Sequence, residues 1–208
     1  MKKIFILGFL AVCASAFISC SSYKDKKEEV DNDTVSSMVL ENLISTDRED
    51  MFNNVSNDYR WFEAYIKMNN YLDEENDGSL SEVLNVFQVV IDYGKSADVK
   101  VYKYNHFSDG SLVKDSIIDF VVGDRPLEKE NITVTFKQAF DKVMETNLPK
   151  PHSRYCVLRK EVGALDCNPQ YIFGNTDAQL YVDAVTGEVR DYNPAFPKDA
   201  QLNYAFSW

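Results

Sequence analysis

The sequence predicts an α+β fold in which helices pack on antiparallel β-meanders, arranged as two helix-plus-meander units. Apolar residues recur at three- and four-residue spacing in two stretches, 36–72 and 133–148, which is the period of a helix with one buried face. Each stretch is followed by runs rich in Val, Ile, Tyr and Phe that turn residues separate, the pattern of consecutive antiparallel strands. Helix then strands, twice over, is typical of α+β architecture.

The N-terminus resembles a bacterial lipoprotein signal. Two lysines precede an apolar run over residues 4–17, and small residues lead to Cys20, as in a secretory signal with its cleavage site. Phe17 stands where such signals usually have Leu. The run of about 14 residues is shorter than the roughly 20 that a membrane-spanning helix needs. We predict a signal peptide at 1–19, lipidation of Cys20 and anchoring in the outer membrane of a Gram-negative cell; a secretory signal with an incidental Cys20 is the alternative.

Residues 20–35 are predicted to form a flexible tether, because this polar, charged stretch has too few apolar side chains to order itself. Lys27, Glu28 and Glu29 resemble a short signal that sends some lipoproteins to the cell surface. A solvated charged linker is the other interpretation. The sequence thus leaves open whether the protein faces the periplasm or the cell exterior.

The charge of the chain argues against two classes of partner. Without residues 1–19 the chain has 20 basic and 33 acidic side chains, a net charge of −13. Such a surface repels phosphate backbones and anionic headgroups. We therefore expect no nucleic-acid partner, and we expect membrane contact through the lipid on Cys20.

The first half, residues 36–122, is expected to hold two helices and then a meander. Helical spacing covers 36–72, and Asp58 is a start signal for the second helix. The strands are predicted at 83–91, 99–107 and 112–122, joined by turns at 94–96 and 108–110.

The second half, residues 123–208, is expected to repeat this order. A helix at 133–148 ends before Pro149 and Pro151. The strands are predicted at 155–162, 170–173, 179–182 and around Val189, and a C-terminal tail follows.

Residues 132–140 (ITVTFKQAF), followed by a meander that ends with residues 180–189 (LYVDAVTGEV), resemble the PepSY and PepSY-like domains of secreted bacterial proteins. The resemblance covers residues 116–192, and the insertion at 163–169 departs from it. Such domains bind or restrain partner proteins, notably peptidases, and carry no catalytic residues, so the resemblance implies a binding function. Asp183 and Gly187 are expected to be structural, since an Asp can accept N–H groups of a turn and a Gly can supply its positive φ.

Two cysteines remain beyond the signal and the lipidation site. Cys156 and Cys167 flank a turn-rich stretch between two predicted strands, and the compartment is oxidising. We predict a disulfide between them. Free buried thiols are an alternative, and a catalytic thiol served by His152 is a third reading that no local protease signature favours.

Residues 73–81 (DEENDGSLS) resemble the start of a calcium loop, with oxygen donors at alternate positions and glycine at the sixth. Leu84 occupies the twelfth position, where a bidentate Glu belongs. We therefore predict no high-affinity metal site and no cofactor. If calcium binds, Asp73, Glu75 and Asp77 are its ligands; a solvated acidic loop is the alternative.

The remaining functional signal is aromatic. Tyr102 and Tyr104 share one face of a predicted strand, and a tyrosine row on an open sheet face would bind peptide or glycan; core packing is the alternative. Metal, phosphate-loop and nucleophile-elbow motifs are absent from the sequence. We expect a non-catalytic lipoprotein that binds or restrains an envelope protein. A surface accessory protein that binds peptide or glycan for uptake is the second hypothesis, and an uncharacterised hydrolase the third.

Overall fold

The computed structural model describes residues 38–92, 98–119, 125–175 and 178–198. The predicted signal peptide, Cys20, the tether and the C-terminal tail from residue 199 onward lie outside the described residues. The described residues all belong to one compact unit.

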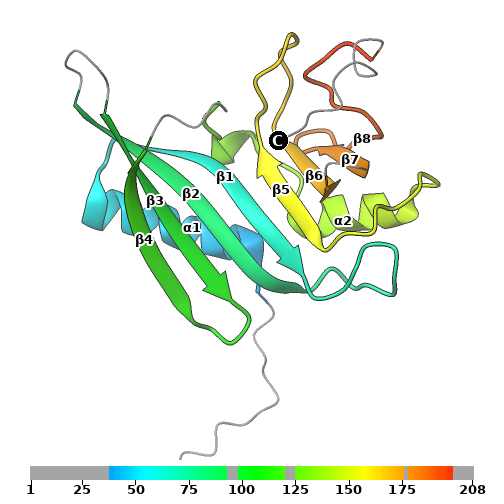
Figure 1. The fold of residues 1–208 in the computed structure, drawn as a ribbon, viewed down its shortest axis with the longest axis horizontal. Helices are drawn as coiled ribbons and strands as arrows, with labels where there is room; N and C mark the ends of the chain where they lie inside the picture. The colour runs from blue at the N-terminus through cyan, green and yellow to red at the C-terminus, as the bar shows by residue number, and fades with distance from the viewer. Residues whose placement is uncertain (1–37, 93–97, 120–124, 176–177, 199–208) are drawn as a thin grey trace, which may run out of the picture. The chain divides into compact units, whose positions relative to one another are not determined.

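Within the described ranges, eight strands form one antiparallel sheet in the order β4-β3-β2-β1-β5-β6-β7-β8 (Figure 1). The elements, in chain order, are α1 (Leu40–Asp50), a π-helical turn (Met51–Val55), β1 (Tyr59–Met68), β2 (Leu80–Asp92), β3 (Asp98–Phe107), β4 (Leu112–Asp119), a 3-10 turn (Lys129–Asn131), α2 (Phe136–Glu145), β5 (Tyr155–Arg159), β6 (Gln170–Asn175), β7 (Ala178–Asp183) and β8 (Val189–Arg190).

The predicted fold class is wrong. The described residues form mainly a single β-sheet with two short α-helices, and not a helix-packed PepSY-like α+β arrangement. The two predicted meanders are not separate, because β1 pairs with β5 from Glu63–Arg159 to Lys67–Tyr155 and joins them edge to edge. The boundary predicted between residues 122 and 123 falls outside the described residues.

The largest local error concerns residues 59–68, which were predicted as a helix and form β1. β1 lies in the middle of the sheet between β2 and β5, and four of its side chains, Trp61, Ala64, Ile66 and Met68, belong to the buried core cluster. A bulge between Trp61 and Glu63 also shifts the alternation by one residue. The helical spacing was read from Trp61, Phe62, Tyr65, Ile66 and Met68, but Tyr65 is 44% exposed and does not belong to the buried set.

The predicted strands and the helix predicted at 133–148 are found close to their expected positions. Helix α2 begins with a capping box, in which the Thr135 hydroxyl accepts from the Gln138 N–H and the Gln138 side chain accepts from the Thr135 N–H. Its buried stripe is formed by Phe136, Ala139, Phe140 and Val143, as the spacing predicts.

Both helices pack on the same face of the sheet, here called the helix face. One buried cluster includes Leu40 and Ile44 of α1, Phe136 and Phe140 of α2, and inward-facing strand residues from both halves. The helices also touch through a polar contact, because the Phe136 N–H donates to Glu41 Oε1 at 2.7 Å. The other side of the sheet is here called the outer face.

Candidate functional site

The two tyrosines predicted as a binding row do not lie on an open face. Tyr104 is 2% exposed and belongs to the core cluster under α1. Its hydroxyl donates to Asp50 Oδ2 at 2.5 Å, and burial and this contact raise the pKa of the phenol. Tyr102, on the same face, is half-buried against the core. The prediction failed because spacing shows which residues share a face but not which face a helix covers.

A polar cluster under α1 was not predicted. Asp47 is 1% exposed; it accepts from Asn85 Nδ2 at 2.6 Å, and both of its oxygens lie 2.9 Å from His106 Nε2. One turn further on, Asp50 accepts from Lys114 and Tyr104. The sequence does hold a signal for Asp47, because Leu40, Ile44, Asp47 and Met51 recur at the spacing of one helix face. The cluster fastens α1 to β2, β3 and β4.

Cys156 and Cys167 are both free thiols, so the predicted disulfide is not formed in this structure. Cys156 points to the helix face, where it belongs to the core cluster. Cys167 instead lines a cavity together with Asp183 and Arg190, whose side chains alternate with the helix-face residue Val182 and its partner Val189 and therefore lie on the outer face. The sheet separates the two thiols.

The thiols are also not paired with a histidine in the described residues. His152 Nδ1 lies 3.0 Å from both carboxylate oxygens of Asp73, and its ring stacks on Tyr71 at 4.1 Å. Burial raises the pKa of Cys156 well above its ordinary value and also raises that of Cys167. Both thiols are therefore protonated and weakly nucleophilic near neutral pH, which disfavours the catalytic-thiol reading.

The acidic loop does not gather its candidate calcium ligands. No group of three His, Cys, Asp or Glu side chains suited to a metal occurs in the part of the chain that the structure describes. Asp73 faces His152, and Asp77 Oδ1 accepts from the Ser79 N–H. Asn76 organises the loop, since its amide donates to Asn70 O and Tyr71 O and accepts from the Gly78 N–H. Gly78, at φ 79°, packs against Phe140 of α2.

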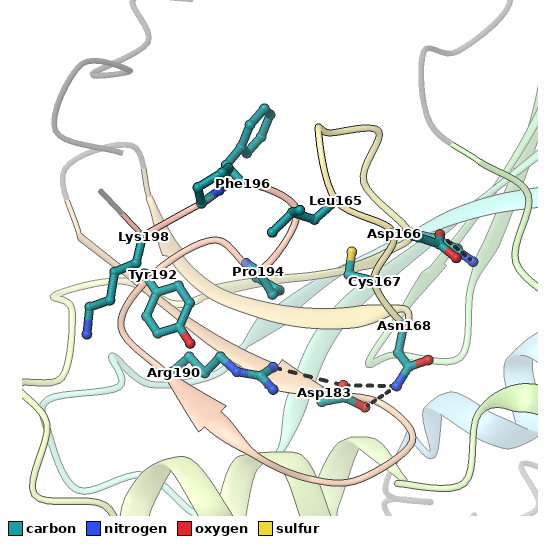
Figure 2. A pocket seen from close by; sticks show the side chains of 12 residues that line it. Leu165, Asp166, Cys167, Asn168, Asp183, Arg190, Tyr192, Pro194, Phe196 and Lys198 are labelled. Atoms are coloured by element: carbon teal, nitrogen blue, oxygen red, sulfur yellow. Dashed lines mark hydrogen bonds and ion pairs between the residues drawn. The ribbon is translucent and has the colours of Figure 1, made fainter. Parts of the chain in front are cut away.

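A cavity of about 480 Å³ lies on the outer face beside β7 and β8. Figure 2 shows its floor, where Asp183 contacts Asn168 and Arg190, and its wall, formed by Leu165, Pro194 and Phe196. Two of the three lining cations have a carboxylate partner, since Arg190 has Asp183 at 3.9 Å and Lys160 has Asp166 at 3.5 Å. The third, Lys198, lies over the Tyr192 ring. The cavity therefore offers a small, nearly neutral surface with one protonated thiol, and no nucleophile–base pair among its described lining residues.

The structural reading of Asp183 and Gly187 is confirmed. Asp183 Oδ1 accepts from the N–H groups of Val185 and Thr186, each at 2.9 Å. Gly187 has φ 73°, and its N–H donates to Asp183 O. Asn168 donates to the same carboxylate, so Asp183 holds both the β7–β8 turn and the loop that borders the cavity.

Strand β4 forms one edge of the sheet (Figure 1). It exposes large aliphatic side chains on both faces. The exposed residues are Leu112 (42%), Val113 (55%), Ile117 (37%) and Ile118 (75%). The opposite edge, β8, has only two residues, Val189 and Arg190. A long apolar edge strand is a template for pairing with another chain, which makes β4 the strongest candidate for an interaction site.

The ladder between β3 and β4 shows which backbone groups of β4 are available. The Phe107 N–H donates to Ser111 O beside the hairpin turn, and hydrogen-bonded pairs alternate along an antiparallel ladder. Counting from there, the backbone groups of Val113, Asp115 and Ile117 point toward β3. Those of Leu112, Lys114, Ser116 and Ile118 point away from the sheet, where a further strand would pair.

Comparison with protein-family models, with curated proteins and with solved structures finds no match to this chain. Among the described residues, no helix combines the length and the apolar character needed to cross a membrane. The resemblance to PepSY-like domains and the lipoprotein signal therefore stay predictions from the sequence.

Proposed function

We propose that this chain is a lipid-anchored, non-catalytic envelope protein that binds a partner protein by pairing with an extended segment of it along β4. The observation that carries the proposal is the exposed edge itself, with four large aliphatic side chains on an eight-residue strand. Backbone pairing along such an edge supplies affinity, while side chains at alternate positions supply selectivity. A segment held in this way is also restrained.

The usual protections of an edge strand are weak in β4. Proteins shield edges with charged side chains, proline, bulges or covering segments. The two charged side chains at the centre of β4 are Lys114 and Asp115, and Lys114 is engaged by Asp50 of α1 at 2.8 Å. The pairing of β3 with β4 is continuous from Val99–Asp119 to His106–Leu112, without a bulge. β4 thus presents an uninterrupted edge to another strand.

Ser116 gives a sharp test of strand addition. Its N–H donates to the Asp115 carboxylate and is directed away from β3, so Ser116→Pro removes an outward donor while it spares the ladder. Ser116→Ala keeps the N–H and is the matched control. A photoreactive amino acid at position 118 (75% exposed) reports contacts at the edge, and the same probe at position 162 (52% exposed) reports contacts elsewhere.

We expect adducts of defined mass with a second protein from position 118 in cells, in the parent and Ser116→Ala backgrounds, and their loss with Ser116→Pro. Equal adducts at positions 118 and 162, or adducts that persist with Ser116→Pro, would overturn the proposal. An adduct of twice the chain's own mass would show that a second copy occupies the edge and would also overturn it. Circular dichroism of each variant checks that the sheet is retained.

The proposed anchor is tested separately. Cys20→Ala should abolish incorporation of labelled fatty acid and release the protein from envelope membranes, because lipid attachment at Cys20 is the proposed anchor. Equal labelling of the variant would refute lipidation at this residue. The second hypothesis, uptake of peptide or glycan through Tyr102 and Tyr104, is disfavoured, because Tyr104 is buried under α1.

A further inference from the structure

We infer that the partner segment carries a basic side chain opposite Asp115, between apolar side chains two residues away on each side. This inference rests on the proposed function and names the chemistry of the segment that β4 accepts. It depends on which face and which pair type each β4 residue occupies.

Asp115 lies on the outer face of the sheet. Lys114 is bonded to Asp50 of α1, so its side chain is on the helix face. Successive strand residues point to opposite faces. Val113, Asp115 and Ile117 therefore form a row on the outer face, with a carboxylate between two exposed aliphatic groups.

The pairing pattern along β4 determines how closely a side chain of the partner approaches Asp115. The backbone groups of Asp115 are directed toward β3, so a strand added to β4 meets Asp115 in a non-hydrogen-bonded pair. In such pairs the side chains approach most closely, with Cα atoms about 4.5 Å apart. Asp115 is therefore in close contact with a partner side chain, as are Val113 and Ile117, and it is the one charged residue of the three.

The charges around Asp115 favour a basic residue opposite it. Asp115 is exposed, and its carboxylate accepts a hydrogen bond from the N–H of the next residue, Ser116. Its cross-strand neighbour in β3 is Lys103, and no ion pair within 4 Å joins the two side chains in the described structure. A basic residue on the added strand would extend a row of alternating charge across three strands, which opposite-charge pairs stabilise and like charges oppose. The acidic chain, with a net charge of −11, also attracts a basic segment.

The test uses three fluorescent peptides with the cores Val-Thr-Lys-Thr-Val, Val-Thr-Leu-Thr-Val and Val-Thr-Glu-Thr-Val, and the full mature protein in detergent. Anisotropy is followed to millimolar protein. We expect the Lys peptide to bind about tenfold more tightly than the Glu peptide, with the Leu peptide between them. Asp115→Lys should invert this order. Glu75→Lys, the same charge change on an exposed loop, should leave the order intact.

Equal affinity of the three peptides, lost in Ser116→Pro, would overturn the basic-residue inference while strand addition stands. The same result follows if Glu75→Lys inverts the order as Asp115→Lys does, because net charge then explains the preference. If no peptide binds the parent protein, or if Ser116→Pro leaves binding unchanged, pairing along β4 is itself refuted.

Discussion

Helix α1 lies over β2 and β3 with the carboxylate of Asp47 in its buried face, whereas α2 packs the ring of Phe136 against Tyr171 and Phe173 of β6. The apolar contact stabilises by removing surface from water. The polar contact depends on every buried group keeping its partner, since an orphaned group costs about 1–3 kcal/mol. The same sheet face thus holds α2 by apolar area, and α1 by apolar area together with a buried polar contact.

Of the two contacts, the apolar one should give the larger loss of stability when it is disrupted. Phe136→Ala removes a ring that is 3% exposed and lies within 6.3 Å of the rings of Tyr171 and Phe173. The free energy of unfolding should fall by about 3–5 kcal/mol. Chemical denaturation measures it. Phe52→Ala, at a residue 59% exposed, is the control and should change stability by less than about 0.5 kcal/mol; similar losses in both would break the comparison.

The polar contact should give the next largest effect. Asp47→Ala leaves Asn85 and His106 without their buried acceptor, and we expect a loss of about 1–3 kcal/mol in unfolding free energy. Asp73→Ala removes the partner of His152, a histidine–aspartate contact in which both side chains are more than a third exposed. That control should cost under about 1 kcal/mol. A larger cost at Asp73 than at Asp47 would contradict the role given to burial.

Low pH should weaken the polar contact of α1, because it protonates Asp50. The hydrogen bond from Lys114, and then that from Tyr104, lowers the pKa of Asp50 from 3.8 to about 2. Because the folded-state pKa is depressed, the stabilisation is complete above the unfolded pKa and is lost as pH falls through about 2. At most about 2 kcal/mol is involved. Unfolding measured from pH 5 to pH 2 should be less pH-dependent in Asp50→Asn than in the parent; parallel profiles would rule this out.

The smallest effect concerns the thiols. A short pulse of alkylating reagent on the native protein should modify Cys167, which is partly exposed, and spare Cys156, which is 2% exposed in the apolar core. Cys156 should react only after unfolding. Mass spectrometry of the labelled peptides checks this. Equal protection of both residues, removed by reductant, would instead show that the protein forms the disulfide predicted from its sequence.

The sequence predicted local structure better than arrangement. The Asp183–Gly187 turn and the stripe on α2 were predicted correctly because each is set by residues within one turn or one helix. Residues 59–68 were assigned wrongly because the bulge in β1 and the exposure of Tyr65 follow from the pairing of β1 with β2 and β5. β4 was predicted as a strand, but its position at an edge follows from the pairing of β1 with β5. The Asp47–His106 contact depends on the same long-range order.

The pairing of Glu63 with Arg159 also affects the order in which the sheet forms. During synthesis β1 leaves the ribosome well before β5 exists, and until then one flank of this apolar strand has no neighbour. Sheets closed by such distant contacts have high contact order and fold slowly, with unpaired strands exposed in the meantime. We therefore expect the β2–β3–β4 hairpins to gain protection from hydrogen exchange earlier in refolding than the β1–β5 seam, so that assembly of the sheet is completed at its middle.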